Sequence, residues 1–264
     1  EAAGTVNAII SQGILPAGLE MMDRLAIKAA EAFVNVGYPL DAEGLLICEL
    51  DGTDAEVQHQ IEKLRLILDK NNAIQVRVAT DAAERMQLWL GRKAAFPAVG
   101  RLAPDYYCMD GTIPRSELAA VLAQITKFSE QHGLDVANVF HAGDGNLHPL
   151  ILYDANKAGE IERAEAFGAD ILNLCIEVGG TITGEHGVGV EKIDQMCIQF
   201  TPEELELFHG VKSAFDESRI LNPGKAVPTL SRCAEFGAMH VHTEGSQQTH
   251  VGLNAQKYSD LERF

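Results

Sequence analysis

The stretch VANVFHAGDGNLHPLILY, residues 136–153, decides the fold. Its two ends, VANVF (136–140) and LHPLILY (147–153), are rich in β-branched and aromatic residues and predict strands. Between them, Asp144-Gly145 is a favoured two-residue hairpin loop. Because a hairpin joins antiparallel strands, the stretch favours an α+β fold with a largely antiparallel sheet covered by helices. A parallel sheet, which strands separated by helices would otherwise suggest, is disfavoured.

The rest of the chain alternates between helical and strand patterns. Apolar spacing predicts helices over 16–36, 54–70, 81–96, about 115–132, about 157–178 and 202–217, and strands over 44–52, 73–79 and 105–113. Residues 179–192, GGTITGEHGVGVEK, carry too many glycines for a long regular element and predict a functional loop. Residues 1–230 are expected to form one domain, and 231–264 a tail with few apolar anchors.

The predicted hairpin places two histidines together. With Asp144-Gly145 as the loop, His141 faces His148 directly across the two strands. Directly opposed residues project from one face with Cβ atoms about 4.5–5.5 Å apart. Both imidazoles could then reach one divalent ion at about 2.0–2.1 Å. The alternative, two polar side chains on a solvated hairpin face, stays open on this feature alone.

A third metal ligand is sought in TGEHGVG (183–189), where glycines on both sides free the backbone. Glu185 is the best candidate, and a set of two histidines and one carboxylate leaves coordination positions open. Such a donor set suits Zn, Mn or Fe. Neighbouring His186 has an imidazole that could act as a general base near neutrality. A capping or supporting role for His186 is an equal alternative.

The composition excludes several classes of function. The formal charge of −17, from 38 acidic against 21 basic residues, argues against a nucleic-acid partner, because phosphate-binding surfaces need clustered Lys and Arg. The five cysteines are scattered without a CxxC pair, which favours a reducing cytoplasm over a disulfide framework. No apolar run approaches the roughly 20 residues that cross a bilayer. Any site for an anion must be a local exception to the negative field.

Three motifs together resemble a known family: HAGDGNLH at 141–148, GEHG at 184–187 and LNPGK at 221–225. They are similar to the C-terminal domain of FAD-linked oxidases in the vanillyl-alcohol oxidase superfamily, which has a ferredoxin-like fold. Three longer stretches, 96–118, 138–156 and 232–242, resemble the glycolate-oxidising branch of that family.

The resemblance implies that a short 2-hydroxy acid, glycolate or D-lactate, is oxidised to the 2-oxo acid, with hydride passing from Cα to the flavin N5. His141, His148 and Glu185 would hold a divalent metal that binds the substrate hydroxyl and carboxylate. His186 would remove the hydroxyl proton.

Further residues acquire roles through the same resemblance. Arg92 matches the family arginine that pairs with the substrate carboxylate, although the residues alone favour a surface helix cation. Asn222 and Lys225 would face the flavin, although their Pro-Gly could simply end a helix. Cys108 and Leu150 stand where relatives acting on 2-hydroxy diacids carry Lys and Asn, so a small monoacid is favoured.

The family context also implies partners. The FAD-binding domain that precedes this region in the family is not among these 264 residues, so the chain alone is expected to be inactive. The intact enzyme is expected to assemble with an iron–sulfur subunit and a second flavin-domain subunit, in the cytoplasm or peripherally at the inner membrane. Two other classes stay open. One is a metal-dependent hydrolase, and the other is a noncatalytic module whose tail, with Cys233, His240 and His242, docks the iron–sulfur subunit.

Overall fold

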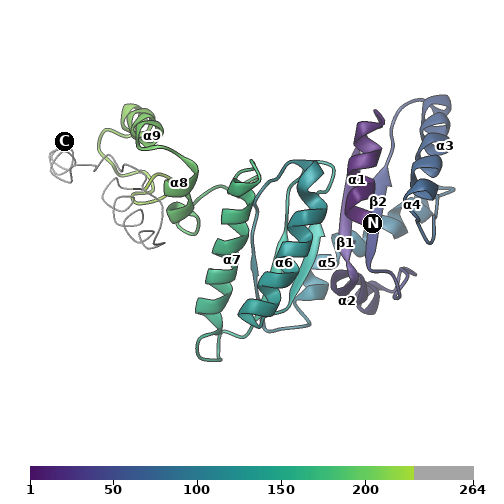
Figure 1. The fold of residues 1–264 in the computed structure, drawn as a ribbon, viewed down its shortest axis with the longest axis horizontal. Coiled ribbons are helices and arrows are strands. Elements are labelled where there is room, and N and C mark those ends of the chain that lie inside the picture. Colours follow the sequence, from purple (N-terminus) through teal and green to yellow (C-terminus); the bar gives the residue numbers. More distant parts are fainter. Residues whose placement is uncertain (229–264) are drawn as a thin grey trace, which may run out of the picture. The chain divides into compact units, whose positions relative to one another are not determined.

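The computed structural model describes residues 1–228, and residues 229–264 are not described (Figure 1). The chain divides into two compact units, Glu1–Gly184 and Glu185–Phe264, and each is treated by itself. The expected tail and its Cys233, His240 and His242 lie outside the described residues.

The first unit is built on one antiparallel sheet. Its five strands lie in the order β2-β1-β4-β5-β3, and every pairing is antiparallel. The strands are β1 (Gly18–Asp23), β2 (Gly44–Glu49), β3 (Asp105–Cys108), β4 (Val136–Phe140) and β5 (Pro149–Tyr153). The expected α+β class with a largely antiparallel sheet is confirmed.

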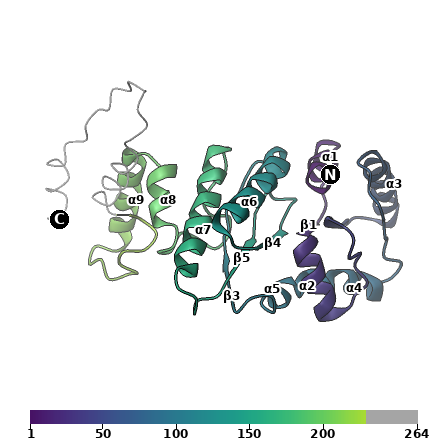
Figure 2. The same cartoon turned by 60° about the horizontal axis from the view of Figure 1, so that its bottom comes forward.

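Helices cover both faces of this sheet. One face carries α1 (Ala2–Ser11), α3 (Asp54–Lys70), α6 (Leu118–His132) and α7 (Glu160–Glu177), and the other carries α2 (Arg24–Val34), α4 (Ala82–Lys93) and α5 (Ala95–Val99) (Figure 2). A short 3-10 helix, Arg115–Glu117, leads into α6. The core under α2 and α5 contains Met22 of β1, Val139 of β4 and Leu150 of β5, all almost fully buried.

Asp23 ties three elements together at the end of β1. One carboxylate oxygen accepts the Ala26 backbone N–H and so caps α2, as N-cap aspartates commonly do. The other oxygen accepts both the backbone N–H and the side-chain amide of Asn138 in β4. Burial raises the pKa of Asp23, and these hydrogen bonds oppose that rise. The register of β1 beside β4 is thereby reinforced.

Two expected elements are wrong. Residues 18–23, expected as the start of a helix, form the inner strand β1. The four middle residues of this strand are buried on both faces of the sheet, so its sequence shows no regular alternation of apolar and polar residues. Residues 73–79, expected as a strand, form no strand and are mostly exposed. Their apolar alternation finds no neighbouring strand with which to pair.

The hairpin loop also differs from the expected one. His141 pairs with Asn146, so the loop is the four residues Ala142–Gly145, and His148 lies opposite Val139 instead of His141. Gly145 has φ +74°, and a Cβ there would lie 2.2 Å from the Ile113 carbonyl oxygen, so only glycine fits. The register shift is two residues, which leaves His141 and His148 on the same face of the sheet.

In the described part of the second unit, α8 (Ile193–Gln199) and α9 (Pro202–Phe215) follow the glycine-rich loop. Thr201 and Glu204 form a reciprocal capping box at the start of α9, with Pro202 in the first turn. The helix expected at 202–217 is confirmed, whereas α8 was not expected. Residues 179–192 contain no helix or ladder strand, as predicted.

Two sequence-wide expectations can be compared with the described residues. None of the helices described between residues 1 and 228 has the length and apolar character needed to span a membrane. Cys48, Cys108 and Cys175 are not disulfide-bonded, as expected, but Cys197 is. Spacing along the chain does not predict which thiols meet in space, and this is why that bond was missed.

Candidate metal and substrate site

Polar side chains from three parts of the sheet gather on the face that carries α2, α4 and α5. Met22 pairs with Val139, and Val139 lies opposite His148, so these three positions share one face. Two residues along each strand, the same face presents Glu20 of β1 and His141 at the end of β4. The apolar core therefore passes directly into a polar cluster.

Glu20 joins two of the residues identified from the sequence. Its Oε2 accepts hydrogen bonds from Arg92 Nε at 2.9 Å and pairs with Arg92 Nη2 at 2.8 Å. Its Oε1 lies 2.9 Å from His141 Nδ1. The side chains of Glu20 and Arg92 are only 11% and 10% exposed. The alternative that Arg92 is a surface helix cation is therefore wrong.

The two hairpin histidines lie next to each other. Their ring centroids are 5.1 Å apart and the rings are nearly perpendicular, at 83°. The ring of Phe96 packs edge-to-face against the buried His148 imidazole, with the ring centroids 6.0 Å apart. The expectation that the fold brings these imidazoles together is confirmed, although they are diagonal and not directly opposed.

Asp110, which sequence reasoning missed, lies fully buried after β3. Its Oδ1 is 3.9 Å from His148 Nε2. Its Oδ2 accepts the Thr183 hydroxyl at 2.7 Å, and its backbone carbonyl accepts the Gly184 N–H at 2.8 Å. Asp110 therefore faces a candidate ligand and also fixes the backbone at the end of the first unit.

Gly184 must be glycine because of its close approach to the hairpin. A Cβ at this position would lie 2.7 Å from the Asn146 side-chain nitrogen. Asn146 is itself buried, at 7% exposure. The chain is thus held tightly at the residue that directly precedes Glu185.

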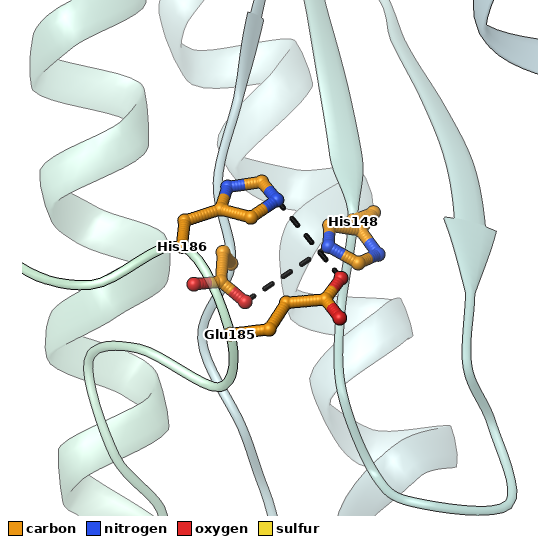
Figure 3. A group of neighbouring side chains, drawn as sticks. His148, Glu185 and His186 are labelled. Carbon is orange, nitrogen blue, oxygen red and sulfur yellow. Dashed lines mark ion pairs between the residues drawn. The ribbon is translucent and has the colours of Figure 1, made fainter.

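The remaining candidates belong to the second unit. His186 Nε2 lies 4.0 Å from Glu185 Oε1, and these side chains are about half exposed (Figure 3). Asn222 and Lys225 are exposed and form a turn in which the Lys225 N–H donates to the Asn222 carbonyl at 3.3 Å. Asn222 has φ +46°. The turn comes well after the last residue of α9, so its Pro-Gly does not end that helix.

Comparison with known proteins places this arrangement in a family. Residues 1–226 match the family model described as FAD linked oxidases, C-terminal domain. The chain belongs to this family. The FAD-linked oxidase domain is 62% identical over 243 residues to the glycolate oxidase subunit GlcD of Escherichia coli strain K12. That alignment covers 92% of the chain and 49% of the relative.

Other relatives carry related names. The domain is 38% identical to the glycolate oxidase subunit GlcD of Bacillus subtilis, covering 85% of the chain and 48% of that protein. It is 30% identical to the mitochondrial D-lactate dehydrogenase [cytochrome] of Arabidopsis thaliana, covering 86% and 40%. The chain spans about half the length, or less, of these curated relatives. These names do not support the hydrolase or assembly-module alternatives.

Solved structures support the fold. A substrate-bound p-cresol methylhydroxylase matches with a TM-score of 0.59 and 16% identity, over 88% of this chain and 52% of that one. A 4-ethylphenol oxidase from Gulosibacter chungangensis matches with the same TM-score, over 86% and 50%. The architecture of the FAD-linked oxidase domain is therefore shared with these oxidases.

Cys108 and Leu150, which the sequence analysis connects with substrate choice, lie side by side in this domain. Cys108 of β3 pairs directly with Leu150 of β5. Leu150 is fully buried and lies two residues beyond His148, on the same face of the sheet. The Cys108–Leu150 pair thus gives the surface next to the His148 imidazole an apolar character.

Proposed function

We propose that this chain is the substrate- and metal-binding C-terminal part of a flavin-dependent dehydrogenase that oxidises glycolate or D-lactate to the 2-oxo acid. The observation that carries the proposal is the meeting of His141 and His148, with ring centroids 5.1 Å apart, beside buried Arg92. An imidazole pair can hold a divalent ion that binds an α-hydroxy acid, and an arginine can pair with its carboxylate. Family membership and the names of the relatives agree with this chemistry.

The donor atoms fit a divalent ion. In this proposal His141 and His148 supply imidazole nitrogens and Glu185 supplies a carboxylate, a donor set that suits Zn, Mn or Fe and leaves positions open for a substrate. Glu185 follows Gly184 directly, so its Cα lies about 3.8 Å from that of a residue held by Asp110 and Asn146. This short tether is the reason for keeping Glu185 as the third ligand.

The chain's own residues divide the remaining work. The N–H groups of Arg92 that do not face Glu20 bind the substrate carboxylate. A ring nitrogen of His186 accepts the hydroxyl proton, and Asn222 and Lys225 contact the flavin. When bound, the metal supplies Lewis acidity and FAD accepts the hydride. These roles are part of the proposal.

The substrate is a monoacid in this proposal. The Cys108–Leu150 pair offers no charged or amide group to a second carboxylate. Leaving a carboxylate unpaired against buried apolar side chains is costly, so diacids are disfavoured and glycolate or D-lactate fits.

Assembly and location extend the proposal. The word "subunit" in the names of the GlcD relatives supports assembly with other chains, and we propose that these are an iron–sulfur subunit and a second flavin-domain subunit. Leu207, Val211 and Phe215 of α9 are 70%, 60% and 84% exposed and form an apolar stripe that a partner could cover. A cytoplasmic location, with contact to the inner membrane through these subunits, is the matching expectation. Fractionation of cells expressing the whole complex tests it.

The central experiment restores the flavin. The chain is joined behind the FAD-binding domain of a full-length relative, loaded with FAD and Zn²⁺ or Mn²⁺, and assayed for glycolate- and D-lactate-dependent dye reduction. Reduction that requires both cofactors is expected. An FAD- and metal-loaded protein that reduces no dye with either acid would refute the proposal.

Variants then separate the roles. His148→Ala and Glu185→Gln are expected to lose bound metal in elemental analysis. His186→Ala is expected to keep the metal and lose at least about 100-fold in rate. His132→Ala is the matched control, because His132 pairs with Asp170 on the far side of the sheet. Unchanged metal content in the first two variants, or a full rate without His186, would contradict the assignments.

A further inference from the structure

Glu20 makes two kinds of contact through its two carboxylate oxygens. One oxygen receives Nε and Nη2 of Arg92, at 2.9 and 2.8 Å. The other lies 2.9 Å from Nδ1 of His141. The carboxylate is buried, at 8% exposure of the residue, so water contributes little to its solvation. Neither the fold prediction nor the family motifs had singled this residue out.

We propose that Glu20 is a positioning residue that fixes the ring tautomer of His141 and so prepares its Nε2 atom to bind a metal. The inference rests on the proposed function for the metal, but the tautomer itself is a property of the chain. It concerns a residue outside the ligand set described above.

The chemistry follows from the donor inventory. Arg92 is always charged, and its N–H groups can only donate, so Glu20 faces it as an ionised carboxylate. An ionised carboxylate can only accept, so the His141 Nδ1 atom must carry the hydrogen that points to it. In a neutral imidazole the lone pair then resides on Nε2. A carboxylate that receives the distal N–H of a metal-binding histidine is a recurrent arrangement that also raises ligand basicity.

The strand that carries Glu20 is suited to this task. β1 is hydrogen-bonded to β2 on one side and to β4 on the other, and Glu20 itself pairs with Ile47. His141 follows the last residue of β4. The two side chains therefore project from adjacent, paired backbones, and Arg92 on α4 holds the carboxylate from above the sheet.

The variant Glu20→Gln gives a sharp test, because it keeps the shape and inverts the hydrogen bond. The amide oxygen of the new side chain must turn toward Arg92, which has only donors. Its NH₂ group then turns toward His141 and donates to Nδ1, so the ring hydrogen moves to Nε2, the atom needed for the metal. In Glu20→Ala/Arg92→Met the carboxylate is removed from His141 Nδ1 without an amide in its place, and Arg92 does not remain as a buried charge without its partner Glu20.

Two readouts are combined on the 264-residue chain. Histidine-selective ¹⁵N NMR of the metal-free protein reports the tautomer, with the His141 signals identified by their loss in His141→Gln. Titration with Co²⁺, followed by calorimetry and by the visible d–d absorption, reports the affinity. The control is Glu49→Gln, which changes a carboxylate on β2 that pairs with Arg85 instead of Arg92.

The expected results form an order. His141 carries its hydrogen on Nδ1 in the wild type and on Nε2 in Glu20→Gln. Co²⁺ affinity falls about 100-fold in Glu20→Gln, about 10-fold in the double variant and not at all in the Glu49 control. A purely structural or charge role for Glu20 predicts the opposite order, with the isosteric Gln binding at least as well as the double variant, and that order would overturn the proposal.

The tautomer result also separates this inference from the proposed function. A wild-type chain that binds no Co²⁺ overturns the metal assignment. In the same sample, a wild-type His141 with its hydrogen on Nε2 overturns the role of Glu20, and a hydrogen on Nδ1 supports it.

Discussion

Replacing Gly145 by alanine tests the corrected hairpin. Gly145 closes the four-residue loop with φ +74°, and its carbonyl accepts the Ile113 N–H at 2.9 Å. A Cβ would lie 2.2 Å from the Ile113 carbonyl oxygen, whereas an ordinary contact begins near 3.4 Å. The two backbones must therefore separate by about 1 Å, and the loop can no longer keep its hydrogen bonds to the segment after β3.

The cost can be added up from these contacts. The left-handed backbone costs an alanine about 1–2 kcal/mol. Separation weakens the hydrogen bond from Ile113 to Gly145 and the one from Leu147 to Gly111, both 2.9 Å long, for about 1 kcal/mol each. Alanine also lowers the conformational entropy of the unfolded chain relative to glycine, which stabilises the folded state by about 0.4–1 kcal/mol. The net destabilisation expected for Gly145→Ala is about 3 kcal/mol.

Gly133→Ala is the matched control. Gly133 follows α6 with φ +63°, and a Cβ there would meet no heavy atom within 4 Å. Gly133→Ala introduces the same left-handed backbone strain and the same reduction of unfolded-state entropy, so it should destabilise the protein by only about 1 kcal/mol. Urea unfolding followed by the fluorescence of Trp89, the single tryptophan, reports the first unit. Equal losses in the two variants would show that the close approach to Ile113 has no energetic weight.

Two further predictions follow from buried ionisable groups. Burial raises the pKa of the Cys48 thiol to about 12. At pH 8, Cys48 of the folded protein should therefore react with iodoacetamide about 1,000-fold more slowly than Cys48 of the urea-unfolded chain, as measured by peptide mass spectrometry. Comparable rates in the two states would contradict this prediction. Burial likewise raises the pKa of Tyr38 to about 12, and its hydroxyl donates to the Leu88 carbonyl. Because the unfolded phenol ionises first, near pH 10, this contribution is complete below pH 10 and is lost as pH rises toward 12. The wild type should therefore lose about 1 kcal/mol more than Tyr38→Phe between pH 9 and 11 in urea titrations, and parallel curves would exclude the effect.

The pairing of the two histidines could be predicted even though the loop was not. The sequence places His141 and His148 on strands joined by a glycine-containing turn, and the expected register differs from the true one by two residues. Side chains alternate with a period of two, so this error moves a residue along its face and not to the other face. The imidazoles meet for this reason, and the capping and strand signals elsewhere place most of the helices correctly.

Glu20 and Asp110 could not be predicted, for two different reasons. Glu20 lies in an inner strand that is buried on both faces, and its sequence does not alternate regularly, so it is also compatible with helical spacing. An acidic residue within the helix expected over 16–36 carries no signal of a binding site. Asp110 follows β3, and its link to Thr183 and Gly184 joins residues far apart in the chain. Local patterns carry no information on such pairs.

The Cys108–Leu150 pair suggests how the substrate range could be changed, by engineering or by divergence within the family. These positions are remote in the gene yet share one cross-strand contact. Exchanging both for longer polar side chains would furnish a new anchoring point beside the imidazole without moving any strand. Two substitutions made together would therefore extend the range of acids that the site accepts. Either substitution alone would bury one polar side chain without its polar neighbour.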